Sequence, residues 1–308
     1  MADLQTSEWQ LDEIQSGIDE LRTHRASGAR KLAVRAAMLL IRCAKEAPED
    51  VPRLAHALMA AQPAMAPVFN LAWRALSSQD VAAACTDFLG SMERNTARVA
   101  ELAADLVEDG VRTITNSFSS TVLAAFREAS RRGKRFSVIC PESRPVCEGV
   151  AMAASLGMAG IDSSVIADAA VYRFLPEARL ALVGSDAVSP RNIYNKTGTA
   201  LLALAAAEFG VRIYALCPSD RFLPSPYEPP PEEPKNPREL VERDLPHVSA
   251  INYYFDATPL EYISGFVTEE GILTPAAMRD QLLGRQTACQ LAPAAVLQPL
   301  AGGQQLSA

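Results

Sequence analysis

Residues 111–140 read VRTITNSFSSTVLAAFREASRRGKRFSVIC, in which two short β-rich runs enclose a helical stretch. The same alternation continues downstream. Its β-rich runs are VRTIT (111–115), RFSVIC (135–140), DSSVIA (162–167), LALVG (180–184) and VRIYAL (211–216). Strands that alternate with helices are typical of βαβ units, and nearly continuous apolar strands are typical of a parallel sheet covered on both faces. The sequence therefore predicts a doubly wound, mainly parallel α/β domain over residues 106–291.

The first third of the chain has a different pattern. Within residues 6–104 no convincing strand occurs, and Leu, Ala, Met and Val recur at helical spacing. Short breaks fall at Ser27-Gly28 and at two proline clusters, 48–52 and 63–67. Residues 1–105 are therefore predicted to form a helical domain that precedes the sheet.

Two segments are predicted to lack helices and strands. Residues 223–238 (LPSPYEPPPEEPKNPR) are rich in proline and glutamate, and proline removes donors that a helix or a central strand needs. This surface loop either covers a site or a partner, or is an exposed insertion without a role. Residues 292–308, rich in Ala, Gly and Gln, are predicted to be a flexible tail.

The composition is that of an ordinary soluble globular protein, because 49% of the 308 residues are hydrophobic and 21% are charged. The net charge of −7 provides no basic field for a phosphate backbone, so direct nucleic-acid binding is disfavoured. The amino terminus carries early acids and lacks an apolar signal region, and no apolar stretch is long enough for a membrane span. We therefore expect a cytoplasmic protein without contact to nucleic acid or membrane.

The sequence carries no recognisable cofactor or metal motif. Six cysteines occur singly, with no C-x-x-C pair and no histidine at metal-ligand spacing: Cys43, Cys85, Cys140, Cys147, Cys217 and Cys289. They are predicted to be reduced, buried thiols. No G-x-G-x-x-G follows the first strand and no G-x-x-x-x-G-K-[ST] occurs, which argues against a dinucleotide site and a P-loop. No cofactor and no metal are expected.

Polar loops after the predicted strands are the first place to look for a ligand site. In open parallel sheets the carboxyl ends of strands meet helix amino termini there. Residues 115–120 (TNSFSS) offer hydroxyls that either cap the next helix or face an anion. Arg144 follows a strand end and is held by Pro145, and its guanidinium group can bind a phosphate or a carboxylate through two donors. The alternative is a structural ion pair of Arg144 with Glu142 or Glu148.

Two further loops and one helix start carry candidate residues. Asp186 ends an apolar strand, where burial would raise its pKa, although it could simply cap a loop. Asn195 and Lys196 stand at the predicted start of a helix, and a lysine there suits an anionic ligand. Ser27-Gly28-Ala29 opens an earlier helix, where small residues permit close backbone approach to a phosphate.

Taken together, these motifs resemble a known family. The matching runs are TNSFSSTVLAAFREA, ESRPVCEG, IADAAV, VGSDAV, NIYNKTGT and FDATPLEYISGFVTEEGILTP. In this order they resemble the regulatory alpha, beta and delta subunits of translation initiation factor 2B, whose superfamily includes methylthioribose-1-phosphate isomerase and ribose-1,5-bisphosphate isomerase. The resemblance implies an amino-terminal helical domain and a Rossmann-like carboxy-terminal domain. It also implies a phosphosugar pocket between them and a homodimer formed through the latter, with higher oligomers as an alternative.

The resemblance assigns roles to individual positions. The isomerases have a catalytic cysteine two residues after the threonine that matches Thr115, and this chain has Ser117 there. Their paired acid corresponds to Asp186, which is kept. Asn116 stands where a histidine is frequent. The resemblance also implies a set of ligand-binding and phosphate-binding positions, which are Ser27, Gly28, Ala29, Arg144, Asn195 and Lys196.

The missing thiol bears directly on catalysis. Aldose-ketose isomerisation needs a group that relays a proton between C1 and C2, and an unassisted serine hydroxyl is a far poorer acid than a thiol. Cys140 or Cys147 could substitute for it, and His24 could approach the pocket. Inert buried cysteines and a structural histidine are the alternatives to these roles.

Three functions follow as hypotheses. The first is a non-catalytic, regulatory protein related to translation initiation factor 2B that binds a phosphorylated sugar or a nucleoside monophosphate. The second is an isomerase of a phosphorylated pentose, in which Asp186 is the acid/base and Ser117 or a water replaces the cysteine. The third is an assembly subunit of a translation or regulatory complex with an empty pocket.

Overall fold

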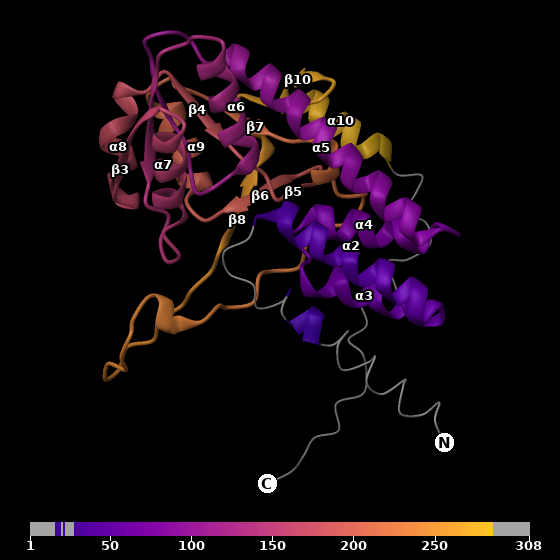
Figure 1. Ribbon diagram of the computed structural model, residues 1–308. Coiled ribbons are helices and arrows are strands. Elements are labelled where there is room, and N and C mark those ends of the chain that lie inside the picture. Colours follow the sequence, from indigo (N-terminus) through magenta and orange to yellow (C-terminus); the bar gives the residue numbers. More distant parts are fainter. Residues whose placement is uncertain (1–15, 20, 22–27, 286–308) are drawn as a thin grey trace.

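The amino-terminal region of the computed structural model, which describes residues 16–19, 21 and 28–285, is helical (Figure 1). Its helices are α2 (Ala29–Glu46), α3 (Val51–Ala61), α4 (Ala66–Leu76) and α5 (Val81–Leu106). The two proline clusters fall at helix starts, since Pro52 and Pro67 occupy first-turn positions where no backbone donor is needed. Asp80 caps α5 by accepting the Ala83 N–H at 2.9 Å.

The five strands predicted from the sequence lie side by side in one sheet. They are β1 (Arg112–Ile114), β2 (Ser137–Pro141), β3 (Asp162–Ile166), β4 (Leu180–Val183) and β7 (Arg212–Leu216). Two later strands, β9 (Gly265–Thr268) and β10 (Gly271–Leu273), complete the order β10-β9-β7-β4-β1-β2-β3. All neighbours are parallel except the β9–β10 hairpin. The predicted α/β fold with a mainly parallel, Rossmann-like sheet is confirmed.

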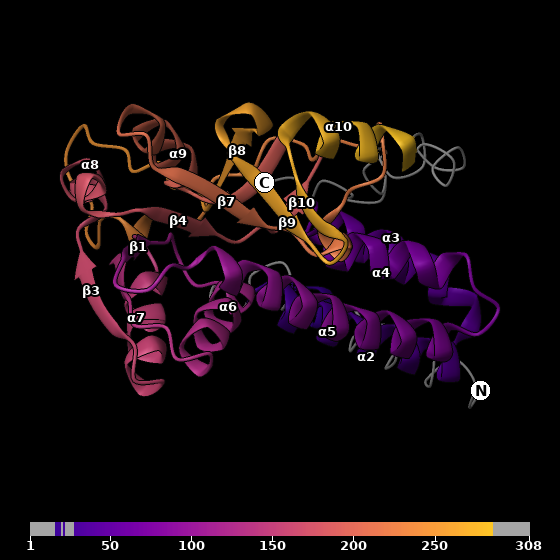
Figure 2. The ribbon, with the colours of Figure 1, turned by 90° about the horizontal axis from the view of Figure 1, so that it is seen from above.

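Helices cover both faces of this sheet (Figure 2). One face carries α6 (Ser120–Arg131) and α7 (Glu148–Met158), and the other carries α8 (Val171–Phe174), α9 (Thr199–Glu208) and α10 (Pro275–Gly284). Successive strand residues point to opposite faces, so Val138 and Leu182 pack under α6 and α7, whereas Ile139 and Ala181 pack under α9. None of the described helices is long and apolar enough to cross a membrane.

A second, antiparallel sheet was not predicted. It consists of β5 (Ala187–Val188), β6 (Asn192–Lys196) and β8 (Phe255–Pro259). Asn195 and Lys196 therefore end a strand, and α9 starts only at Thr199, where the sequence had suggested a helix start for the whole segment. The reason is long-range pairing, since Asn195 and Lys196 lie opposite Asp256 and Phe255.

Helix α5 connects the helical region to the main sheet. Its first half packs into the helical core through Cys85, Phe88 and Met92. Its second half packs against α6 and the main sheet through residues that include Val99 and Ala103. The predicted boundary at residue 105 falls at the end of this shared helix, and the predicted tail, residues 292–308, lies outside the described residues.

The proline-rich loop continues past its predicted end, as residues 223–254 contain only one short 3₁₀ turn (Figure 1). Its first part is packed against the helical region, because the ring centroids of Tyr227 and Phe69 are 4.5 Å apart. Its middle part extends away from the body of the molecule (Figure 1). Lys235 and Asn236 line a cavity, so the loop covers part of a candidate site.

Candidate functional site

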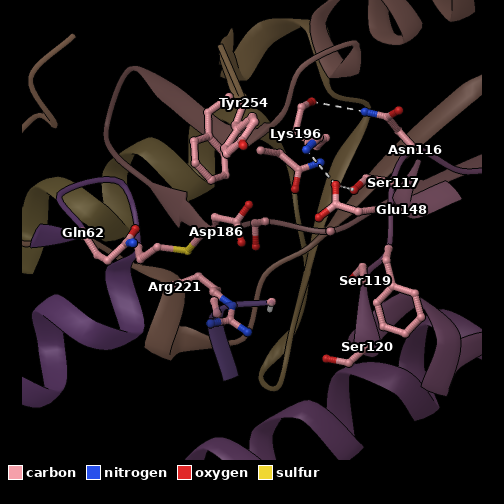
Figure 3. Close-up of a pocket in the computed structure, with 18 of the residues that line it drawn as sticks. Gln62, Asn116, Ser117, Ser119, Ser120, Glu148, Asp186, Lys196, Arg221 and Tyr254 are labelled. Carbon is pink, nitrogen blue, oxygen red and sulfur yellow. Dashed lines mark hydrogen bonds and ion pairs between the residues drawn. The ribbon is translucent and has the colours of Figure 1, made fainter. Parts of the chain in front are cut away.

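A cavity of about 330 Å³ lies between the helical region and the carboxyl ends of β1 and β4 (Figure 3). Its wall comes from the loop after β1, the loop after β4, the start of α2, the end of β6 and the proline-rich loop. We call it the main cavity. Its polar lining residues include Gln62, Asn116, Ser117, Ser119, Ser120, Glu148, Ser185, Asp186, Asn195, Lys196, Arg221, Lys235 and Asn236.

Ser117, Glu148 and Lys196 form a connected group in the main cavity. The Ser117 hydroxyl donates to Glu148 Oε2 at 3.1 Å, and Lys196 Nζ lies 2.7 Å from the same oxygen. The lysine side chain is only 7% exposed and also lies 4.6 Å from the centre of the Tyr254 ring. The charge of Lys196 is therefore balanced within the protein by Glu148, and the serine proton points at a carboxylate.

The turn that carries Ser117 is held from two sides. Ser117 has a positive φ of 62°, and its N–H donates to Ser143 Oγ at 2.9 Å. Ser143 in turn donates its own N–H to Asp168 Oδ1 at 2.7 Å. These bonds tie the loops after β1, β2 and β3 together and fix the position of the Ser117 hydroxyl.

Asp186 is the acid at the centre of the main cavity (Figure 3). Burial raises its pKa to about 6, with Glu148 adding to the rise and Arg221 and Lys196 opposing it. The Asp186 backbone links the second sheet to the helical region. Its N–H donates to the Tyr194 carbonyl of β6, and its carbonyl accepts the N–H of Ala66 at the start of α4. A carboxyl group with such a pKa can both give and take a proton near neutral pH.

The two asparagines of the site hold the turn between β6 and α9. Asn195 Nδ2 donates to Thr199 Oγ1 at 2.9 Å, and Asn116 Nδ2 donates to the same oxygen and to the Lys196 carbonyl, both at 3.1 Å. Both asparagines are buried. Asn116, where the resemblance would have placed a histidine, is thus a structural amide that positions Lys196.

The helix start at Gly28, which the sequence suggested for its small residues, opens on the main cavity. Gly28 and Ala29 line the cavity, and no side chain among the described residues caps α2. The first N–H groups of the helix therefore lack intrahelical acceptors and can donate hydrogen bonds to an anion. Ser27, the first residue of this motif, lies outside the described residues, as does His24.

Arg144 is not among the residues that line the main cavity. It is exposed, and its Nη2 donates to the Glu239 carbonyl at 3.1 Å, so it holds the proline-rich loop. Its N–H donates to Asp168 Oδ2 at 2.8 Å. Glu148, one of its two suggested partners, pairs with Lys196 instead.

Arg221 and Glu148 are cavity residues that the sequence analysis did not select. Arg221 is 5% exposed, and its Nη1 lies 3.1 Å from Asp220 Oδ2. It follows β7 directly, so the search for polar loops at strand ends could have found it. Glu148 is the first residue of α7, and no motif in the sequence distinguishes it from Glu142.

No described cysteine or histidine lines the main cavity. Cys140 is buried, which raises the pKa of its thiol to about 12, and Cys147 Sγ contacts the Pro145 carbonyl at 3.9 Å. His56 lies on α3, where its Nδ1 is 2.7 Å from the Pro52 carbonyl oxygen. Cys289 lies outside the described residues.

Comparison with known proteins identifies relatives with the same fold. The chain is 36% identical over 267 residues to a putative translation initiation factor eIF-2B subunit 2-like protein of Pyrococcus horikoshii, covering 83% of this chain and 94% of the relative. It is 28% identical over 284 residues to a ribose 1,5-bisphosphate isomerase of Archaeoglobus fulgidus, covering 86% and 91%. The crystal structure of a Pyrococcus horikoshii translation initiation factor eIF-2B superimposes with a TM-score of 0.77 and 33% identity, covering 85% and 97%.

The family assignment rests on most of the chain. Residues 25–275 match the initiation factor 2 subunit family, a range that includes both the helical region and the main sheet. The resemblance inferred from the motifs is thereby confirmed. This chain belongs to the initiation factor 2 subunit family.

Proposed function

We propose that the main cavity binds a phosphorylated sugar or a nucleoside monophosphate and that this binding is regulatory. The charge of the wall carries the proposal. Three basic and two acidic residues line it: Lys196, Arg221, Lys235, Glu148 and Asp186. With all five groups ionised the lining carries one net positive charge, and the pKa of Asp186, which burial raises to about 6, makes the lining more positive as the pH falls towards that value. A volume of about 330 Å³ falls within the range of small-ligand sites.

The arrangement suggests how such a ligand would lie. The free N–H groups at the start of α2 and the Arg221 guanidinium supply donors for a phosphate. Asp186, Asn195 and the paired Glu148 supply groups that hydrogen-bond to sugar hydroxyls. Arg221 takes the place in this proposal that the sequence had suggested for Arg144.

Thermal denaturation with a panel of sugar phosphates and nucleoside monophosphates tests the proposal. We expect ribose 1,5-bisphosphate or another member of the panel to raise the melting temperature, because a ligand of the native state stabilises it. Gly28→Asp should weaken binding at least tenfold, whereas Gly28→Ser should retain most of it. Both side chains suit a helix N-cap, and a Cβ at Gly28 meets nothing within 4 Å, so the pair differs mainly in charge. A panel without any stabilising ligand would contradict the proposal and favour an assembly subunit of a translation complex.

A second candidate function, isomerisation of a phosphorylated pentose, is favoured by Asp186. A pKa of about 6 suits an acid/base that relays a proton between two carbons. The Ser117 hydroxyl donates a hydrogen bond to Glu148, so this carboxylate can act as the base that accepts its proton. Any ligand found in the panel should then be followed by NMR for conversion to a ketose. Conversion that Asp186→Asn abolishes would establish the isomerase, and binding without conversion supports the regulatory role.

We also propose a homodimer formed through the main-sheet region. Large apolar side chains are exposed on α7, α8, α9 and β3, which lie on one side of the molecule (Figure 1). They are Val150, Met158, Val165, Tyr172, Leu201 and Leu204. An apolar surface of this extent marks an interface. Light scattering should give twice the 33.1 kDa of one chain, and Leu201→Glu should halve that mass, whereas Leu283→Glu on α10 should not. A monomeric wild-type protein would contradict the proposal.

A further inference from the structure

A second cavity, of about 610 Å³, lies between α4, α5 and the short 3₁₀ turn Ser219–Arg221. Asp220 lines this second cavity, whereas its neighbour Arg221 lines the main cavity. The turn therefore separates the two cavities. None of the residues that line the main cavity belongs to the second cavity, which is lined by Asn70, Trp73, Arg74, Ser77, Phe88, Ser91, Met92, Asn95, Ser219, Asp220 and Arg285.

Two arginines from distant parts of the chain line the second cavity. Arg74 comes from α4 in the helical region, and Arg285 follows α10 beyond the main sheet. In the part of the chain that the structure describes, neither guanidinium lies within 4.0 Å of a carboxylate oxygen. Arg285 Nη1 donates to the Ser219 carbonyl at 3.5 Å, and both guanidinium groups lie near rings: Arg74 lies 5.9 Å from the centre of Phe88, and Arg285 lies 4.8 Å from that of Phe222.

The acidic groups beside these arginines are already engaged. Glu269 accepts Asn95 Nδ2 at 2.8 Å and the Ser219 N–H at 3.0 Å. Asp220 has its oxygens buried and lies 3.1 Å from the Arg221 guanidinium. Desolvation lowers the pKa of Arg285, whereas the charges of Glu269 and Glu270 oppose this shift. The wall of the second cavity thus has two guanidinium groups without an ion-pair partner among the described residues, and one carboxylate, Asp220, that is paired with Arg221.

The remaining wall of the second cavity combines apolar and uncharged polar side chains. Trp73 is half-buried, and Phe88 and Met92 are almost fully buried beside it. Rings of this kind stack on planar ligands, while guanidinium groups bind carboxylate and phosphate oxygens in a fork. Hydroxyl groups of Ser77 and Ser91 lie in the same wall.

We propose that the second cavity binds a small anion, a carboxylate or a phosphate monoester, that carries an aromatic ring. Its charged group lies between Arg74 and Arg285, and its ring lies against Trp73 and Phe88. This site is independent of the function proposed for the main cavity, because no side chain that lines one lines the other.

Fluorescence of Trp73 tests this site directly. The chain has two tryptophans, so Trp9→Phe leaves Trp73 as the sole reporter. In this background, phenyl phosphate or benzoate should change the emission with a saturable curve. Inorganic phosphate should bind at least tenfold more weakly than phenyl phosphate, because it lacks the ring. Arg74→Gln and Arg285→Gln should each raise the dissociation constant about tenfold.

Two variants serve as controls. Arg98→Gln removes an exposed arginine of α5 that lines neither cavity, and Gly28→Asp disturbs only the main cavity. Both should leave the Trp73 titration unchanged. The proposal is overturned if neither aromatic anion gives a saturable change, or if the change persists without both arginines. It is also overturned if Gly28→Asp abolishes the change, since the signal would then come from the main cavity.

Discussion

Replacing Gly149 by alanine is expected to cost at least about 4 kcal/mol of unfolding free energy, or about 10 °C in melting temperature. A Cβ at this position would lie 1.7 Å from the Pro141 carbonyl oxygen and 2.8 Å from its carbon, both backbone atoms that cannot swing aside. The Gly149 N–H also donates to the Glu142 carbonyl at 3.1 Å. Thermal and chemical denaturation of the purified variant measure the loss.

The same helix provides a control of opposite sign. Gly157 lies near the end of α7, and a Cβ there would meet nothing within 4 Å. Gly157→Ala should leave stability unchanged or raise it by up to about 1 kcal/mol, because alanine is the better helix former. If Gly149→Ala were as stable as the wild type, the start of α7 would not lie so close to the end of β2.

The close approach at Gly149 also explains the place of Glu148. Because α7 begins directly against the last residue of β2, its first side chain lies at the carboxyl end of the sheet and lines the main cavity. There Glu148 meets Lys196 from β6. A single glycine thus links backbone packing to the charge balance of the site.

Much of the fold could be predicted from the sequence because its signals are local. The run VRTIT contains β1, the run RFSVIC contains all of β2 except its last residue, Pro141, and the apolar run LALVG contains β4. The second sheet escaped prediction because its strands are defined by a partner far along the chain: Tyr194 pairs with Ala257, and neither segment has a strong strand pattern alone.

Part of the site was also predictable, because several of its residues stand in local loops and motifs. Ser117, Asp186, Asn195 and Lys196 were selected from loops and motifs, and the structure brings all four into one cavity. Arg144 and Arg221 both follow strands, and only the three-dimensional path of the chain separates them. Arg144 extends to the proline-rich loop, whereas Arg221 is buried in the cavity wall.

The ion pair between Glu148 and Lys196 should be worth more to stability than an exposed pair. Glu148→Gln leaves the Lys196 ammonium, 7% exposed, without a counter-charge, and we expect a loss of about 3 kcal/mol. Lys196→Met leaves Glu148, which is 21% exposed and better solvated, so its loss should be smaller. The double variant should be more stable than Glu148→Gln alone, because it buries no unpaired charge. Urea denaturation of all four proteins gives the coupling free energy.

An exposed ion pair on α5 provides the reference for the double-mutant cycle of Glu148 and Lys196. Arg98 Nη1 and Glu101 Oε2 are 3.0 Å apart, but the two side chains are 54% and 50% exposed. Water screens such a pair, so Glu101→Gln should change stability by less than about 1 kcal/mol.

A Glu148→Gln loss no larger than this value would mean that Lys196 has access to water or to another acceptor. The ammonium would then be free for a ligand phosphate, and the lysine would return to the phosphate-binding role that the sequence suggested. A large loss with strong coupling instead assigns the ion pair to the framework of the cavity, and leaves Arg221 and the start of α2 as its phosphate donors.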